Sequence, residues 1–139
     1  MSTIHIVGDL GDGAYGTTLI LELRSSEAAR WLSTVLLRLA DGGGWVDVAT
    51  LPEVRLRNVS HLVLSRVAKP AAKRLRLVDG DRLYWTGTTG EWRTACDLLE
   101  GLADGRSRHQ YLSEERYDDV LVVVSQGEHH LGLSSWMPD

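Results

Sequence analysis

The sequence predicts an α+β fold built from two similar strand-strand-helix-strand units, with the helices packed on antiparallel β-sheet. Residues 35–43 read VLLRLADGG and residues 98–106 read LLEGLADGR, so nearly the same string recurs 63 positions later. Each copy follows two strand-like segments and precedes another. One unit alone has too few strands to bury its helix and its own sheet, so we expect both units to form a single domain over residues 1–139.

The first unit is assigned to residues 1–68. Segments 3–10 (TIHIVGDL) and 17–24 (TTLILELR) are rich in β-branched and apolar residues, and they are expected to form a hairpin. Ser25 is placed to cap a helix, and Gly42 is expected to end it, because glycine tolerates the left-handed conformation of a helix stop. The apolar positions of this helix, spaced by three and four residues, are Ala29, Leu32, Val35, Leu36 and Leu39.

Segment 54–67 (VRLRNVSHLVLSRV) follows a glycine-rich bend and predicts a strand that is bent or broken near Asn58. The residues KPAA at 69–72 interrupt this pattern. Since proline cannot donate to a sheet, we place the boundary there and assign the second unit to residues 69–139. The recurrence favours an internal duplication, although two unrelated helices with similar endings would also produce it.

The second unit begins with two expected strands, 74–78 (RLRLV) and 81–87 (DRLYWTG), around an Asp-Gly turn that is typical of hairpins. Thr88 and Glu91 have the spacing of a capping box, so a second helix should begin there. Its apolar positions, each 63 after its counterpart, are Trp92, Ala95, Leu98, Leu99 and Leu102. The branched run at 119–125 (DVLVVVS) is expected to be a buried strand.

Composition indicates an ordinary globular chain, with 43% hydrophobic and 24% charged residues and no apolar run long enough to cross a membrane. The single cysteine and a start without a basic leader favour the cytoplasm. Arginine outnumbers lysine 13 to 2, which suggests a bacterial source. The net charge is −4, but a basic middle, residues 54–82, lies between two acidic ends.

Three motifs are interpreted as structural. Residues 11–16 spell G-x-G-x-x-G, but strand-like residues follow where a nucleotide-binding loop requires a helix, so a hairpin turn is expected. His129 and His130 are adjacent and would point to opposite faces of an extended chain, so no metal site is expected. Cys96 lies inside the second helix and is interpreted as a small core residue.

Four arginines form a candidate anion-binding surface. Arg55 and Arg57 alternate with a leucine, as do Arg74 and Arg76, so each pair should project from one face of its strand. If the two strands are neighbours, four guanidinium groups share one surface that can hold phosphates or an acidic partner. The alternative is a charged sheet edge that discourages aggregation. We do not expect nucleic acid, since the chain is acidic and no aromatic residues interleave with these arginines.

A candidate ligand-binding site lies where the two units differ. The second unit carries Trp85 before its helix and His109, Gln110 and Tyr111 after it. If the strand and the loop meet at one end of the sheet, these rings would bind a small molecule or a protein. The alternative is that the tryptophan belongs to the core and that the loop is merely polar.

The sequence predicts a non-catalytic binding protein of the bacterial cytoplasm, without a cofactor. The preferred form is an immunity-type or inhibitor protein that binds another protein, because a small acidic domain suits electrostatically steered association. The alternative is a small-molecule-binding protein or enzyme with a site around Trp85, His109 and Tyr111, with His129 near by. The sequence leaves the oligomeric state open.

Overall fold

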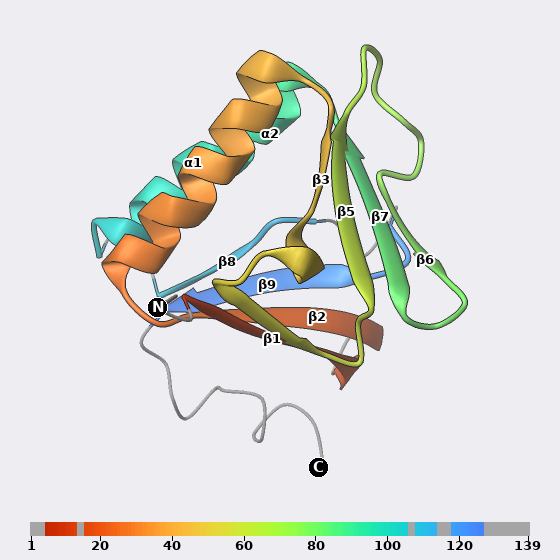
Figure 1. Cartoon of the computed structure of the whole chain (residues 1–139), viewed down its shortest axis with the longest axis horizontal. Helices are drawn as coiled ribbons and strands as arrows, with labels where there is room; N and C mark the ends of the chain where they lie inside the picture. The colour runs from red at the N-terminus through yellow and green to blue at the C-terminus, as the bar shows by residue number, and fades with distance from the viewer. Residues whose placement is uncertain (1–4, 14–15, 106–107, 114–117, 127–139) are drawn as a thin grey trace.

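The computed structural model describes residues 5–13, 16–105, 108–113 and 118–126, and it confirms the predicted α+β class. Two β-sheets stand at an angle to one another, and two helices close the open side, so that the core lies between the sheets and the helices (Figure 1). Both sheets combine parallel and antiparallel strand pairs.

The larger sheet has five strands in the order β4-β1-β2-β9-β8. These are β1 (Ile6–Gly13), β2 (Gly16–Leu23), β4 (Val54–Arg57), β8 (His109–Tyr111) and β9 (Leu121–Gln126). β1 and β2 form the predicted hairpin, in which Gly13 lies opposite Gly16. The glycines of the G-x-G-x-x-G segment therefore lie at the end of β1 and the start of β2, and β2 stands where a nucleotide-binding loop would need a helix.

The smaller sheet has four strands in the order β3-β5-β7-β6. These are β3 (Trp45–Asp47), β5 (His61–Arg66), β6 (Leu75–Val78) and β7 (Arg82–Gly87), and a short 3-10 helix, η1 (Val48–Thr50), follows β3. Asp79 and Gly80 both have positive φ in the predicted hairpin turn between β6 and β7. Asn58, with φ of 65°, breaks the predicted long strand into β4 and β5.

Each sheet takes strands from both halves of the chain. β2 pairs in parallel with β9, and β5 pairs in parallel with β7, so each hairpin continues into strands of the other half. Neither half contains a complete sheet of its own. The order of strands and helices is similar in the two halves, but β4 has no counterpart among the described residues of the second half, and common descent of the halves stays a prediction.

The helices begin where their caps predict. In α1 (Ser26–Gly42) the Ser25 hydroxyl accepts a hydrogen bond from the amide of Ala28, the third residue of the helix, as an N-cap does. In α2 (Thr89–Ala103) the capping box is complete, since the Thr88 hydroxyl accepts from the Glu91 amide and the Glu91 carboxylate accepts from the Thr88 amide.

The end of α1 lies one residue later than predicted. Gly42 is still helical, and Gly43 has a positive φ of 75° with ψ of −163°, a conformation that is open mainly to glycine. The Arg66 guanidinium, from β5, lies against Gly43 and donates to the Ala40 carbonyl at 3.3 Å. A cation at this point is favourable because the last turn of α1 has no basic residue of its own, while its carbonyls carry partial negative charge.

The two helices run antiparallel and touch through reciprocal contacts. Arg30 of α1 pairs with Asp104 at 3.9 Å, and Arg93 of α2 pairs with Asp41 at 2.6 Å. Each residue of one pair lies 63 positions from its counterpart in the other pair. In one pair the arginine comes from α1, and in the other pair the corresponding arginine comes from α2. The two helices are therefore related by an approximate two-fold axis.

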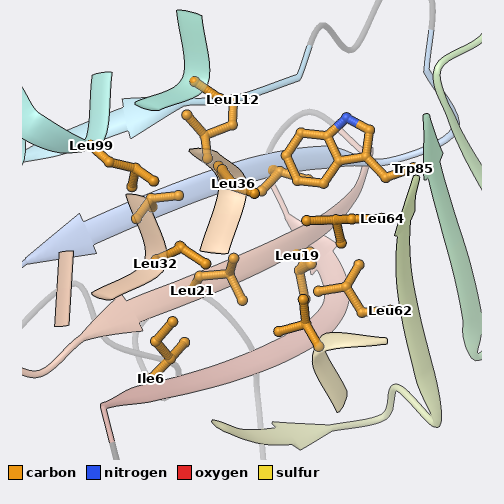
Figure 2. Close-up of a cluster of buried hydrophobic side chains, with 14 of the residues drawn as sticks. Ile6, Leu19, Leu21, Leu32, Leu36, Leu62, Leu64, Trp85, Leu99 and Leu112 are labelled. Carbon is orange, nitrogen blue, oxygen red and sulfur yellow. The ribbon is translucent and has the colours of Figure 1, made fainter. Parts of the chain in front are cut away.

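The core forms where the apolar faces of both sheets and both helices meet (Figure 2). Buried and less buried residues alternate along β5 and β7, so one face of the smaller sheet packs on the core and the other faces solvent. β9 is different, because its residues from Leu121 to Ser125 are all buried. Labelled core side chains in Figure 2 include Ile6, Leu19, Leu21, Leu32, Leu36, Leu62, Leu64, Trp85, Leu99 and Leu112.

Candidate functional site

A hollow of about 290 Å³ lies between α1 and β3. Its walls are mainly apolar and aromatic, and they come from α1 on one side and from β3 and the segment after η1 on the other. The apolar residues that line it are Trp31, Val35, Leu39, Trp45, Val46 and Leu51. This volume is at the lower end of the roughly 300–1,000 Å³ typical of small-molecule pockets, so the hollow can accept one large side chain or a small ligand.

Trp45 stands at the edge of the hollow because of how β3 leaves α1. Gly43 and Gly44 both have positive φ, which turns the chain sharply at the end of the helix. β3 then pairs with β5 so that Val46 lies opposite Leu64 of the core, and Trp45 points to the other face. Trp45 is 70% exposed as a result, although tryptophan is usually well buried.

The second tryptophan of the hollow, Trp31, is less exposed. It lies on α1, and the His5 ring packs against it with a centroid distance of 5.6 Å. The His5 and Ile6 amides donate to the Glu53 carbonyl, which fixes the start of β1 beside this wall of the hollow. The site is therefore built on a helix and two strand ends.

Two opposite charges, Arg38 and Glu53, also line the hollow. Arg38 extends from α1, and Glu53 lies just before β4. Within the part of the chain that the structure describes, neither charged group forms an ion pair or a hydrogen bond. Both charges remain available to a bound molecule.

The predicted ligand-binding residues are divided between the core and the surface. Trp85 lies on β7, where the alternation of the strand turns it inward, and it is only 3% exposed (Figure 2). His109, Gln110 and Tyr111 form β8 at the edge of the other sheet, and the rings of His109 and Tyr111 meet edge to face at 5.9 Å. The structure brings these two rings together but keeps the Trp85 indole away from them and from solvent. His129 lies outside the described residues.

The four candidate arginines do not share a surface. Arg55 and Arg57 lie on β4, at the edge of the five-stranded sheet, while Arg76 lies on β6, at the edge of the four-stranded sheet. Arg57 pairs with the buried Asp9, with Nε and Oδ2 3.4 Å apart. The expectation that these two strands are neighbours is wrong, because β4 pairs with β1 in one sheet and β6 pairs with β7 in the other.

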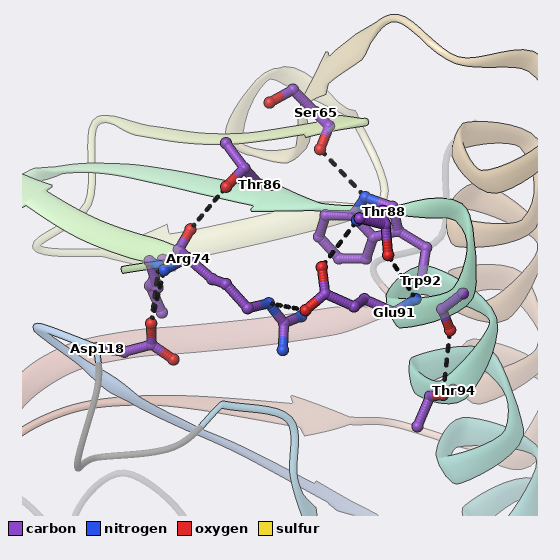
Figure 3. Close-up of polar contacts among 10 residues, drawn as sticks. Ser65, Arg74, Thr86, Thr88, Glu91, Trp92, Thr94 and Asp118 are labelled. Carbon is purple, nitrogen blue, oxygen red and sulfur yellow. Dashed lines mark hydrogen bonds and ion pairs between the residues drawn. The ribbon is translucent and has the colours of Figure 1, made fainter. Parts of the chain in front are cut away.

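Arg74 is also engaged within the protein. Its guanidinium pairs with Glu91, with Nε and Oε2 3.2 Å apart, and its amide donates to Asp118 (Figure 3). It precedes β6, and so it connects the start of the hairpin to the capping box of α2. Its side chain is only about a quarter exposed, which leaves little of it for an anionic ligand.

Asp47 and His61 form a pair that sequence reasoning missed. His61 Nδ1 lies 2.6 Å from one Asp47 carboxylate oxygen, and the other oxygen accepts from the Leu62 and Ala49 amides. Asp47 thereby holds β3, η1 and β5 together, and the imidazole is about half exposed. The residues are 14 positions apart on strands that pair only after folding, so no local pattern indicates this contact.

Two features are absent from the described residues. No group of three or more His, Cys, Asp and Glu side chains there is arranged to hold a metal ion. No helix there is long and apolar enough to cross a membrane. His129 and His130, considered from sequence as metal ligands, lie outside these residues.

No protein-family model matches this chain, and no curated protein and no solved structure is significantly similar to it. The hollow beside Trp45 combines an exposed indole with two charges that no other described residue pairs, and it is the candidate site.

Proposed function

We propose that this chain is a non-catalytic binding protein whose ligand is another protein, in the manner of an inhibitor or immunity protein. The observation that supports this most directly is the exposed Trp45 at the edge of an apolar hollow. Tryptophan and arginine are enriched among the few residues that dominate binding energy at protein interfaces, and Arg38 lines the same hollow. A large indole that stays in water gains apolar burial only when a partner covers it.

The proposal includes a bacterial cytoplasm as the setting. The arginine-rich composition and a single, buried cysteine support it. The excess of carboxylates at both ends of the sequence favours a partner that is basic overall, because opposite charge speeds association.

Affinity capture with three versions of the full chain tests this function. The wild type, Trp45→Ala and Leu37→Ala would be used as baits in lysate from the source cells and with the products of neighbouring genes. Leu37, on α1, is the matched control, since it is also large, apolar and exposed but lies outside this hollow. If Trp45 is a hot spot worth about 2 kcal/mol or more, its loss should weaken binding roughly 30-fold.

The proposal requires a stoichiometric protein that the wild type and Leu37→Ala retain and that Trp45→Ala loses. Equal capture by all three baits would refute the role of the hollow. Absence of any stoichiometric protein, together with a metabolite found by native mass spectrometry, would count for the small-molecule alternative instead.

A further inference from the structure

The hollow beside Trp45 contains two charges that its own neighbours do not use. Arg38 and Glu53 line it from different elements, and among the described residues neither is paired with the other or with a third group. They share the hollow with the indoles of Trp31 and Trp45. A free cation and a free anion beside an apolar floor define what can bind there.

A partner that covers the hollow removes water from both charges. Loss of hydration is costly for an ionised group unless an opposite charge replaces the water. A partner with only acidic groups at the contact would leave the Glu53 carboxylate without a positive charge beside it. A partner with only basic groups would leave the Arg38 guanidinium without a negative charge. A partner that matches both charges therefore loses least free energy on contact, and this difference discriminates among partners.

We propose that the partner protein inserts an apolar side chain into this hollow, flanked by one carboxylate that pairs with Arg38 and one ammonium or guanidinium group that pairs with Glu53. This inference rests on the proposed protein-binding function and specifies the chemistry of the contact. The volume of about 290 Å³ supports a single inserted side chain.

Five blocked tripeptides serve as probes of this chemistry. Two carry mixed charges, acetyl-Asp-Leu-Lys-amide and acetyl-Lys-Leu-Asp-amide, and three are references with Lys-Leu-Lys, Asp-Leu-Asp and Ser-Leu-Ser. The measurement follows the indole N–H signals of Trp31 and Trp45 in the ¹⁵N-labelled full chain, with assignments from Trp31→Phe and Trp45→Phe. One mixed-charge peptide should bind roughly fivefold more tightly than the neutral peptide, as two exposed ion pairs allow.

A charge exchange provides the decisive comparison. Arg38→Glu combined with Glu53→Arg should reverse which mixed-charge peptide binds better, because the positions of the two charges are exchanged. The matched control exchanges a pair outside the hollow, Asp41→Arg with Arg93→Asp, and should leave the preference unchanged. Thermal unfolding of both double variants checks that the fold is retained.

The inference is overturned if the neutral peptide binds as well as the mixed-charge ones, if the exchange does not reverse the preference, or if no peptide shifts the two indole signals. These outcomes are separable from failure of the proposed function. Trp45-dependent capture of a protein without any peptide preference refutes the charge pattern alone. The expected peptide preference without any captured protein refutes the protein partner and leaves the chemistry of the hollow in place.

Discussion

The Cys96 thiol on α2 donates a hydrogen bond to the carbonyl oxygen of Ser33 on α1, with Sγ and O 3.4 Å apart. The two residues are 63 positions apart, which is the offset between the two copies of the repeated string. Residues at corresponding positions of two helices touch each other only close to a two-fold axis. The helix crossing at Cys96 and Ser33 therefore lies near the axis that the reciprocal ion pairs define.

Burial at this crossing raises the pKa of the Cys96 thiol, and the nearby carboxylates of Glu100, Asp97 and Asp41 raise it further. The protonated thiol should therefore stabilise the fold fully below the ordinary thiol pKa of about 8.5, and this contribution is lost as pH rises through the higher folded pKa. We expect the free energy of unfolding to fall more between pH 7 and pH 10 for the wild type than for Cys96→Ala. Urea unfolding of both proteins at several pH values measures this free energy. An equal decrease with pH in the two proteins would contradict the prediction.

Gly87 is required because the Trp92 indole lies against it. A Cβ at this position would come within 2.8 Å of Trp92, which is fully buried and donates its Nε1–H to the Ser65 carbonyl at 3.1 Å (Figure 3). Gly87→Ala should lower the free energy of unfolding by about 1–3 kcal/mol, because a buried ring has little room to move. Gly90→Ala is the control, since its Cβ meets nothing within 4 Å and alanine favours the helix. Similar stabilities of the two variants would show that the Trp92 contact is not restrictive.

Asp119 connects the chain before β9 to the edge of β6. Lys73 donates to its carboxylate at 2.7 Å and so lowers the pKa of Asp119, with a further contribution from the Leu77 amide. The stabilisation is present above the ordinary carboxyl pKa and is lost as pH falls through the lower folded pKa. It should be small, because about a third of the Asp119 side chain is exposed.

Lys73→Met should raise the pKa of Asp119 towards its ordinary value, because the hydrogen bond from Lys73 is the largest cause of the lowered pKa. The carboxyl carbon signal of Asp119, followed by NMR as pH is lowered, measures this pKa. Lys69→Met removes the same charge from the same loop without a hydrogen bond to Asp119, and it should leave the titration unchanged. An unaltered midpoint in Lys73→Met would be inconsistent with the role of the lysine.

Local chemistry predicted the parts of the fold that depend on near neighbours in sequence. Ser25, Thr88 and the Asp-Gly turn before β7 each act within a few residues, so their caps and hairpin could be recognised before folding. Strands β3 and β8 were missed because three residues are too few to show a period of two. The parallel pairs β2–β9 and β5–β7 join segments far apart, and no local pattern indicates such neighbours.

The candidate site was harder to predict for the same reason. Nothing local in the sequence shows that Trp45 stays in water while Trp85 becomes part of the core. Burial of Trp85 follows from its position opposite Leu64 on β5, which is a tertiary contact. Arg38 and Glu53 lie 15 positions apart and share a hollow only because β3 turns back along α1.

Each sheet contains strands from both halves of the chain, so the linker between β5 and β6 must be long enough for the two halves to pair. β5 and β6 both pair with β7, one on each side, so residues 67–74 span two strand spacings, roughly 10 Å, and also pass around the end of β7. Most of this linker is exposed, and its ends are fixed by hydrogen bonds from the Val67 amide to Gly87 and from the Thr86 amide to Arg74. Its length decides whether one chain can complete both of its own sheets.

Deletion of residues 68–73 should convert the protein into a strand-exchanged dimer. Three Cα–Cα steps would then join Arg66 to Leu75 and reach at most about 11 Å, too short for the route around β7. The first half of one chain can still pair with the second half of another, because all contacts between halves are preserved in that exchange. Light scattering after size-exclusion chromatography should give twice the monomer mass, whereas replacement of the same six residues by Gly and Ser should give a monomer. A folded monomer from the deletion variant would show that the halves can close without the linker, and loss of folding would show that the exchanged arrangement is not accessible.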